Sequence, residues 1–323
     1  MGYVLERDES VEDGVRRIAR EQLDDAVDDL ENLIDDDPAD AVHDVRKRCK
    51  KVRGLVRLVR PSLGEDTYRV ANDTARDAGR HLSDLRDATA LMETFELVVD
   101  RSEMDRDADD EAGTAVRAVG DVLRSRHRRA VDQLDHDHPA VRRARDLVVG
   151  CRSASVSWTL DDDGWDAIGP GVAKTYKRGR SAFETASEAP TGANFHELRK
   201  RVKYSWYHVR LVADASPTVL SPLASAFHDL SDALGDAHDM AVLHDVLRTE
   251  EADLVDLPDL TPIDRLLGGF RSVLEQRALS LGARLYTEPR SAYVERLGGY
   301  WQAWLDHGDE RPTGGIDEIR DDD

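Results

Sequence analysis

The sequence predicts an all-α protein built from two helical bundles related by an internal duplication. Aromatic residues make up only 6% of the 323 residues and charged residues 34%, a composition that suits solvated helices better than sheets. Apolar residues recur at helical spacing along most of the chain. One basic segment occurs twice, at 43–59 and at 196–212. These observations favour two related helical halves of about 150 residues each.

The first half is expected to begin with a helical hairpin. Apolar residues repeat at helical spacing up to the turn DDDPAD, and Pro61 ends the basic helix that follows. Further helical stretches continue the half. The predicted helices cover about residues 9–34, 40–60, 65–101, 114–134 and a segment after Pro139.

The second half is expected to repeat this order. The segment 151–171 is rich in Gly and Ser with little helical periodicity, so it is predicted to connect the halves. Predicted helices then begin near residue 172, after the turn EAPTGAN and near residue 220, and the last two cover about 264–286 and 291–305. The domain is therefore expected over 1–307, with halves at about 1–150 and 171–307 and a mobile acidic tail at 308–323.

The two basic segments match without gaps. They are identical at His43/His196, Arg46/Arg199, Lys47/Lys200, Arg48/Arg201, Lys50/Lys203 and in the closing run VRLV. A second match follows, because LSDLRDATAL at 82–91 corresponds to LGDAHDMAVL at 234–243, at nearly the same distance from each basic segment. The duplication is therefore expected to span a multi-helix unit.

At 100° per residue, the cations of each copy fall on one face of a helix, and aliphatic residues fall on the other. The first polar face holds His43, Arg46, Lys47, Lys50, Gly54 and Arg57, opposite Val45, Cys49, Val52, Val56 and Val59. The second polar face holds His196, Arg199, Lys200, Lys203, Tyr207 and Arg210, opposite Leu198, Val202, Val209 and Val212.

The remaining sequence is strongly acidic. The formal net charge is -21 and the chain has only seven lysines, a balance typical of halophilic surfaces. Five of these lysines lie in the two basic segments, and the other two are Lys174 and Lys177. Lysine is therefore interpreted as kept where it serves a function.

Neighbouring cations on one helix face repel one another by a few tenths of a kcal/mol per pair, and no Glu four residues earlier compensates them. Acidic residues of other helices or an anionic ligand must neutralise them, and we favour the ligand. Arg and Lys together suit phosphate oxygens. Because a salty cytoplasm screens charges beyond about 3 Å at 1 M salt, a groove or pore that contacts a long polyanion is expected.

The start of each basic helix is expected to add to this site. Asp40 and Asn194 are predicted N-caps, which would place His43 and His196 in the first turn, where free N–H groups favour anions. The two histidines could equally be packed, hydrogen-bonded structural residues.

Other site types find little support. No run of 18 apolar residues and no leader sequence occurs, so a soluble, cytoplasmic protein without membrane association is expected. Cys49 and Cys151 are interpreted as reduced structural residues. No cofactor or metal is expected.

The paired H-x-x-R-K-x-x-K helices, the two L-x-D-x-x-D segments and the closing segment ALSLGARLYTEPRSAYVERLGGYWQAW resemble the CHAD domains, named for conserved histidines in an α-helical domain. The resemblance implies two helical bundles around a basic surface or pore that binds inorganic polyphosphate, with no catalytic activity. It also suggests association with polyphosphate granules.

Carried over by position, the resemblance implies a set of phosphate ligands. They are Arg46, Lys47, Lys50, Arg57, Arg199, Lys200, Lys203 and Arg210, with His43 and His196 as the histidines that name the family. Arg16 and Arg20 on the first helix, with Tyr176, Lys177 and Arg180 on its counterpart, match positions that line the same surface.

Two alternatives stay open at this point. Asp84, Asp87, Asp236 and Asp239 could hold Mg²⁺ in a polyphosphate or triphosphate hydrolase, although they suit ion pairing with the cations better. The cationic faces could also follow single-stranded nucleic acid, a reading disfavoured by the net charge and the few aromatic residues.

Overall fold

The computed structural model describes residues 2–102, 104, 108, 110–248 and 258–308, and in this part of the chain the secondary structure is helical throughout. Residues 105–107 and 109 of the acidic stretch, and the predicted tail beyond residue 308, lie outside the described residues. Among the described helices, none combines the length and hydrophobicity needed to cross a bilayer.

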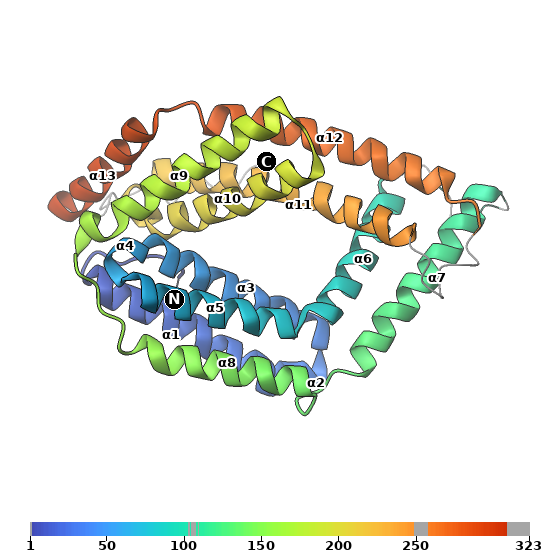
Figure 1. The fold of residues 1–323 in the computed structure, drawn as a ribbon, viewed down its shortest axis with the longest axis horizontal. Coiled ribbons are helices and arrows are strands. Elements are labelled where there is room, and N and C mark those ends of the chain that lie inside the picture. The colour runs from blue at the N-terminus through green and yellow to red at the C-terminus, as the bar shows by residue number, and fades with distance from the viewer. Residues whose placement is uncertain (1, 103, 105–107, 109, 249–257, 309–323) are drawn as a thin grey trace, which may run out of the picture.

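The first half forms the lower layer in Figure 1, and α6 and α7 extend from it toward the upper one. Its long helices are α1 (Val11–Asp28), α3 (Pro38–Leu58), α5 (Glu65–His81), α6 (Ser83–Asp100), α7 (Glu111–Asp132) and α8 (Pro139–Ser155). Short elements join them: the π-helix η1 (Asp29–Leu33), α2 (Ile34–Asp36) and α4 (Arg60–Leu63).

The second half forms the upper layer. It consists of α9 (Gly164–Glu188), α10 (Gly192–Leu211), η2 (Ala213–Ala215), α11 (Pro217–Leu247), α12 (Thr261–Leu285) and α13 (Arg290–His307).

Helices pack in the same order within each half. In the first, α1 contacts α3 and α8, α3 contacts α5, and α6 contacts α7. In the second, α9 contacts α10 and α13, α10 contacts α11, and α11 contacts α12. The halves meet where α10 contacts α3 and where α11 contacts α6.

The predicted core face of each basic helix is confirmed. On α3, Val45, Cys49, Val52, Val56 and Val59 are all at most 2% exposed. On α10 and at its end, Leu198, Val202, Val209 and Val212 are equally buried. Burying these aliphatic side chains against α1, α5, α9 and α11 fixes which face of each helix is left for charged residues.

Two predicted boundaries are wrong. The stretch 65–101 is two helices, interrupted at Leu82, whereas the matching part of the second half is the single helix α11. The connection is also shorter than expected: α8 continues to Ser155 and α9 begins at Gly164, so only 156–163 join the halves. The sequence did not predict these helical segments, because small residues rather than large apolar side chains form their buried faces and pack closely there. Gly171, for example, lies directly against the carbonyl of Leu58.

Candidate functional site

The two basic helices cross with direct contact. α3 and α10 run in the same direction in Figure 1, and a Cβ added to Gly54 would lie 3.0 Å from the Cβ of Tyr207. Beside this contact, His208 Nε2 lies 3.1 Å from the Gly54 carbonyl oxygen. Tyr207, predicted on the polar face, is instead 1% exposed, because its ring fills the crossing. The two cationic faces are therefore turned toward each other rather than toward separate surfaces.

Before the crossing, matched cations of the two helices influence one another. Part of the Lys50 side chain is exposed, yet protein atoms surround it on most sides. This loss of hydration, followed by repulsion from Lys203, Arg46, Arg199 and Arg86, lowers the pKa of Lys50 to about 7. Lost hydration, followed by repulsion from Arg199, also lowers the pKa of Lys203. Lys50, Lys203, Arg46, Arg199 and Arg86 thus form a cluster of like charges, called the Lys50 cluster below.

Arg46 and Arg199 belong to this cluster, and the guanidinium group of each packs against a neighbouring helix. Arg46 donates a hydrogen bond from an Nη atom to the carbonyl of Gly79 on α5. The guanidinium of Arg199 lies over Gly235 on α11, where an added Cβ would be 3.4 Å from an Nη atom. The Nε atoms of both arginines are buried without a hydrogen-bond partner among the described residues. Small residues on α5 and α11 therefore let both guanidinium groups approach backbone while leaving donors unused.

Lys47 and Lys200 differ from Lys50 and Lys203, because each has an acidic neighbour on its own helix. Lys47 Nζ lies 3.5 Å from a carboxylate oxygen of Asp44. Lys200 forms an ion pair with Glu197, which also pairs with Arg201. Both lysines are exposed. Acidic residues three positions earlier, rather than four, therefore partly compensate the charges of these two lysines.

The predicted N-caps are wrong. Asp37 and Thr191 cap the helices by accepting hydrogen bonds from the N–H groups of Asp40 and Asn194, at 3.1 Å and 3.3 Å. His43 and His196 therefore lie in the second turn, where their N–H groups bond within the helix. Helix N-termini add no free N–H groups at these histidines.

The histidines lie beside other charged groups. Burial, then Arg86, lowers the pKa of His43, and burial, then His238, lowers the pKa of His196. The His196 ring centroid is 4.7 Å from that of His238. His43 and His196 are therefore uncharged at neutral pH and do not add to the repulsion. Each neutral ring has one hydrogen-bond donor and one acceptor.

The matched carboxylates face the same region. Burial raises the pKa of Asp87, on which both Arg46 and Asp239 act electrostatically. Burial also raises the pKa of Asp236, next to Asp232 and Asp239. Within the described part of the chain, no three His, Cys, Asp or Glu side chains group closely enough to hold a metal ion. Asp87, Asp239 and Asp236 partly balance the charges of Arg46, Lys203 and Arg199 through space.

Beyond the crossing, two arginines stack on aromatic rings. The Arg57 guanidinium lies 4.2 Å from the Tyr204 ring centroid, and Arg210 lies 5.2 Å from that of Trp206. An Nη atom of Arg57 also donates to Asn72 at 3.2 Å. Stacking holds the two planar groups while leaving most of their N–H donors free.

The five candidates on α1 and α9 have other surroundings. Arg16 donates to the Trp158 carbonyl at 2.7 Å and pairs with Glu12, while Arg20 is exposed on the same helix. Tyr176 is 1% exposed and donates its hydroxyl proton to the Glu288 carbonyl at 3.0 Å, so it is a core residue.

Lys177 and Arg180 line a recess with Arg290 and Glu184 on the side of α9 near α13. None of the four side chains in this recess belongs to the Lys50 cluster. By contrast, Arg60, Lys174, Arg178 and Arg201 do gather next to Arg57. The only sequence signal for this group was the scarcity of lysine.

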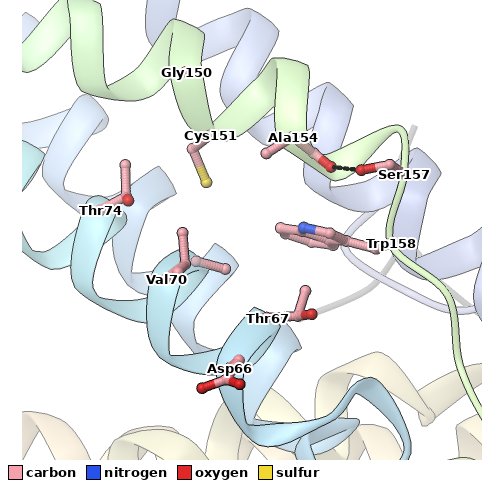
Figure 2. A pocket seen from close by; sticks show the side chains of 10 residues that line it. Asp66, Thr67, Val70, Thr74, Gly150, Cys151, Ala154, Ser157 and Trp158 are labelled. Atoms are coloured by element: carbon pink, nitrogen blue, oxygen red, sulfur yellow. Dashed lines mark hydrogen bonds between the residues drawn. The ribbon is translucent and has the colours of Figure 1, made fainter.

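A separate pocket of about 390 Å³ lies between α5 and α8 (Figure 2). Trp158, Val70 and Cys151 line it, and Asp66 is its only charged residue. It has no cation for an anionic ligand and lies apart from the basic helices.

Comparison with known proteins supports the fold and the family. The family model described as CHAD domain matches residues 17–248. PptA from Streptomyces chartreusis has a similar structure, with 13% sequence identity, a TM-score of 0.55, and coverage of 90% of this chain and 99% of that one. A search of curated proteins gives no match. CHAD domains are a family associated with polyphosphate binding. The family model matches well over half of this chain, so the chain belongs to the CHAD domain family.

Proposed function

We propose that this protein binds inorganic polyphosphate, without catalysis, between the facing cationic sides of α3 and α10. The observation that carries the proposal is the Lys50 cluster, in which all four charged groups that most affect Lys50 are cations. Keeping such like charges together costs free energy that a bound anion would recover. Family membership points to the same ligand.

A chain of phosphates suits this geometry better than a single phosphate ion. Cations occupy three successive turns of α3, from Arg46 through Lys50 to beyond the crossing at Arg57. Their spacing extends over about 16 Å by the rise of a helix. Only a ligand with negative charge along its length can contact all of them.

The two halves are proposed to arise by duplication and to contribute matched residues to one site. The sequence match between the two basic segments supports this, as does the repeated order of helix contacts. A cytoplasmic location at polyphosphate deposits follows from the proposed ligand. The acidic remainder of the surface would suit a cell with high internal salt.

The test is titration with long-chain polyphosphate at low and high salt. Lys50→Gln/Lys203→Gln should weaken binding about 100-fold, because two charge-assisted contacts are lost. Arg143→Gln/Arg265→Gln makes the same charge change at exposed positions on α8 and α12 and should bind within about threefold of wild type. Equal weakening by both variants would show that only overall charge matters and would contradict the proposed site.

The same samples decide between the alternatives. Release of orthophosphate from polyphosphate with Mg²⁺, abolished in Asp87→Ala or Asp239→Ala, would identify a hydrolase and contradict the non-catalytic proposal. Displacement of polyphosphate by single-stranded RNA at equal phosphate concentration would identify a nucleic-acid site instead.

A further inference from the structure

Five cations converge on a small recess beyond the helix crossing. Arg57 and Arg60 from α3 and α4, Lys174 and Arg178 from α9, and Arg201 from α10 line it with Tyr204. Only two of the five have an acidic partner: Arg60 pairs with Glu65 at 2.7 Å, and Arg201 pairs with Glu197. Among the described residues, no carboxylate lies within ion-pairing distance of Arg57, Lys174 or Arg178.

The surroundings of these three cations show that their charge is unbalanced. Loss of hydration, then Arg60, lowers the pKa of Lys174. Loss of hydration, then Arg201, lowers the pKa of Arg178. The Nε atom of Arg57 is buried without a hydrogen-bond partner in the described structure. Donors and positive charge are therefore both left over at this recess.

The matching place in the other half is different. Arg210, the counterpart of Arg57, lines a recess that contains Asp214 and Asp229 and no other Lys or Arg. Arg48, the counterpart of Arg201, is bound by Asp25 of α1 and Asp29 of η1, each at 2.7 Å. Acidic residues thus lie near Arg210 and Arg48, whereas α9 brings further cations to Arg57 and Arg201.

We propose that the recess formed by Arg57, Arg60, Lys174, Arg178 and Arg201 binds the terminal phosphate group of a linear polyphosphate. A terminal phosphate carries a charge of about −1.5 to −2 at pH 7, whereas each internal phosphate carries one negative charge. The recess holds three cations without an acidic partner among the described residues, which balances one doubly charged group better than singly charged internal phosphates. Arg57 lies about two helical turns beyond Lys50, on the other side of the Gly54–Tyr207 contact, so a chain held at Lys50 must pass beside that contact for its end to reach the recess.

This inference rests on the proposed function, and its test separates the two. Linear tripolyphosphate and cyclic trimetaphosphate have the same number of phosphorus atoms, but only the linear form has terminal phosphates. Wild-type protein should bind the linear form about tenfold more tightly than the cyclic one. Lys174→Gln/Arg178→Gln should reduce this preference to about threefold or less, since it removes two of the three unpaired cations.

Two comparison variants complete the experiment. Arg143→Gln/Arg265→Gln should keep the preference, and so should Lys50→Gln/Lys203→Gln, although the latter weakens long-chain binding. A wild type without preference for linear tripolyphosphate, or a preference that survives in Lys174→Gln/Arg178→Gln, would overturn the inference while leaving long-chain binding intact. Absence of long-chain binding with the preference preserved would instead contradict only the proposed function. Thermal unfolding of each variant checks that it is folded.

Discussion

Lys50 should take up a proton when a polyanion binds. In the free protein its pKa is lowered to about 7, first by lost hydration and then by Lys203. A bound anion favours the ammonium form, so binding raises this pKa toward the ordinary value of 10.5. The perturbation that isolates this effect is Lys50→Arg, which keeps the positive charge but does not titrate near neutral pH.

The size of the effect follows from the pKa of about 7 in the free protein. Binding should take up about 0.1 proton at Lys50 at pH 6, about 0.5 at pH 7 and about 0.9 at pH 8. By linkage, affinity falls as the pH rises through this range, with an upper limit of about tenfold between pH 6 and pH 8. Because part of the side chain is exposed and screened, a change nearer threefold is expected.

The assay is isothermal titration calorimetry with long-chain polyphosphate in buffers of different ionisation enthalpy. The dependence of the observed enthalpy on the buffer gives the number of protons taken up. Burial and Arg210 lower the pKa of Lys51 to about 8, so Lys51 adds uptake in wild type and in Lys50→Arg alike. The difference between the two proteins at pH 7 should be about 0.25 proton for a threefold change in affinity, and at most about 0.5 proton. Equal uptake by both would refute the reasoning.

Three further predictions concern stability. Gly171→Ala should lower the free energy of unfolding by about 2 to 4 kcal/mol, because the new Cβ overlaps the Leu58 carbonyl. Gly150→Ala, in an open part of α8, should instead raise it by about 0.5 to 1 kcal/mol. Urea unfolding measures both changes. Burial lowers the pKa of His208 to about 3. The folded state therefore binds fewer protons than the unfolded one, so stability is lost as the pH falls below about 6.5. About 2 kcal/mol of the free energy of unfolding should be lost between pH 7 and pH 5. His208→Gln should reduce this loss. Arg48→Gln should reduce the melting temperature but not polyphosphate affinity, since Asp25 and Asp29 already occupy its guanidinium; reduced affinity would contradict that assignment.

Much of the fold could be predicted because the aliphatic residues of the long helices are spaced regularly. Val45 and Val52 illustrate this, since both are buried on the predicted face of α3. The pattern fails where small residues make the contacts. Gly171 packs against backbone, and Ser155 is buried with its hydroxyl bonded to the carbonyl of Arg152, so this helical sequence looks like a loop.

The site was predictable only in part. The repeat gave the matched pair Lys50 and Lys203, but it could not show that the two helices cross at Tyr207. The caps were misplaced because each true cap lies three residues before another residue able to cap, as with Asp37 and Asp40. The scarcity of lysine marks Lys174, but neither Lys174 nor Arg178 could be assigned to a site from the sequence, since both lie on α9, outside the repeated segments, and reach Arg57 only through the fold.

The contact between Gly54 and Tyr207 has a consequence for how such a protein can arise. These residues occupy the same place in the two matched segments, yet one has no side chain and the other has a large ring. In a symmetric homodimer, both positions would carry the same residue: two tyrosines would collide at the 3.0 Å approach, and two glycines would leave a gap. Joining both copies in one chain removes that restriction, because each position can then change independently. Within a single chain, Gly54 can therefore stay small while the Tyr207 ring fills the contact, which lets the two basic helices approach closely.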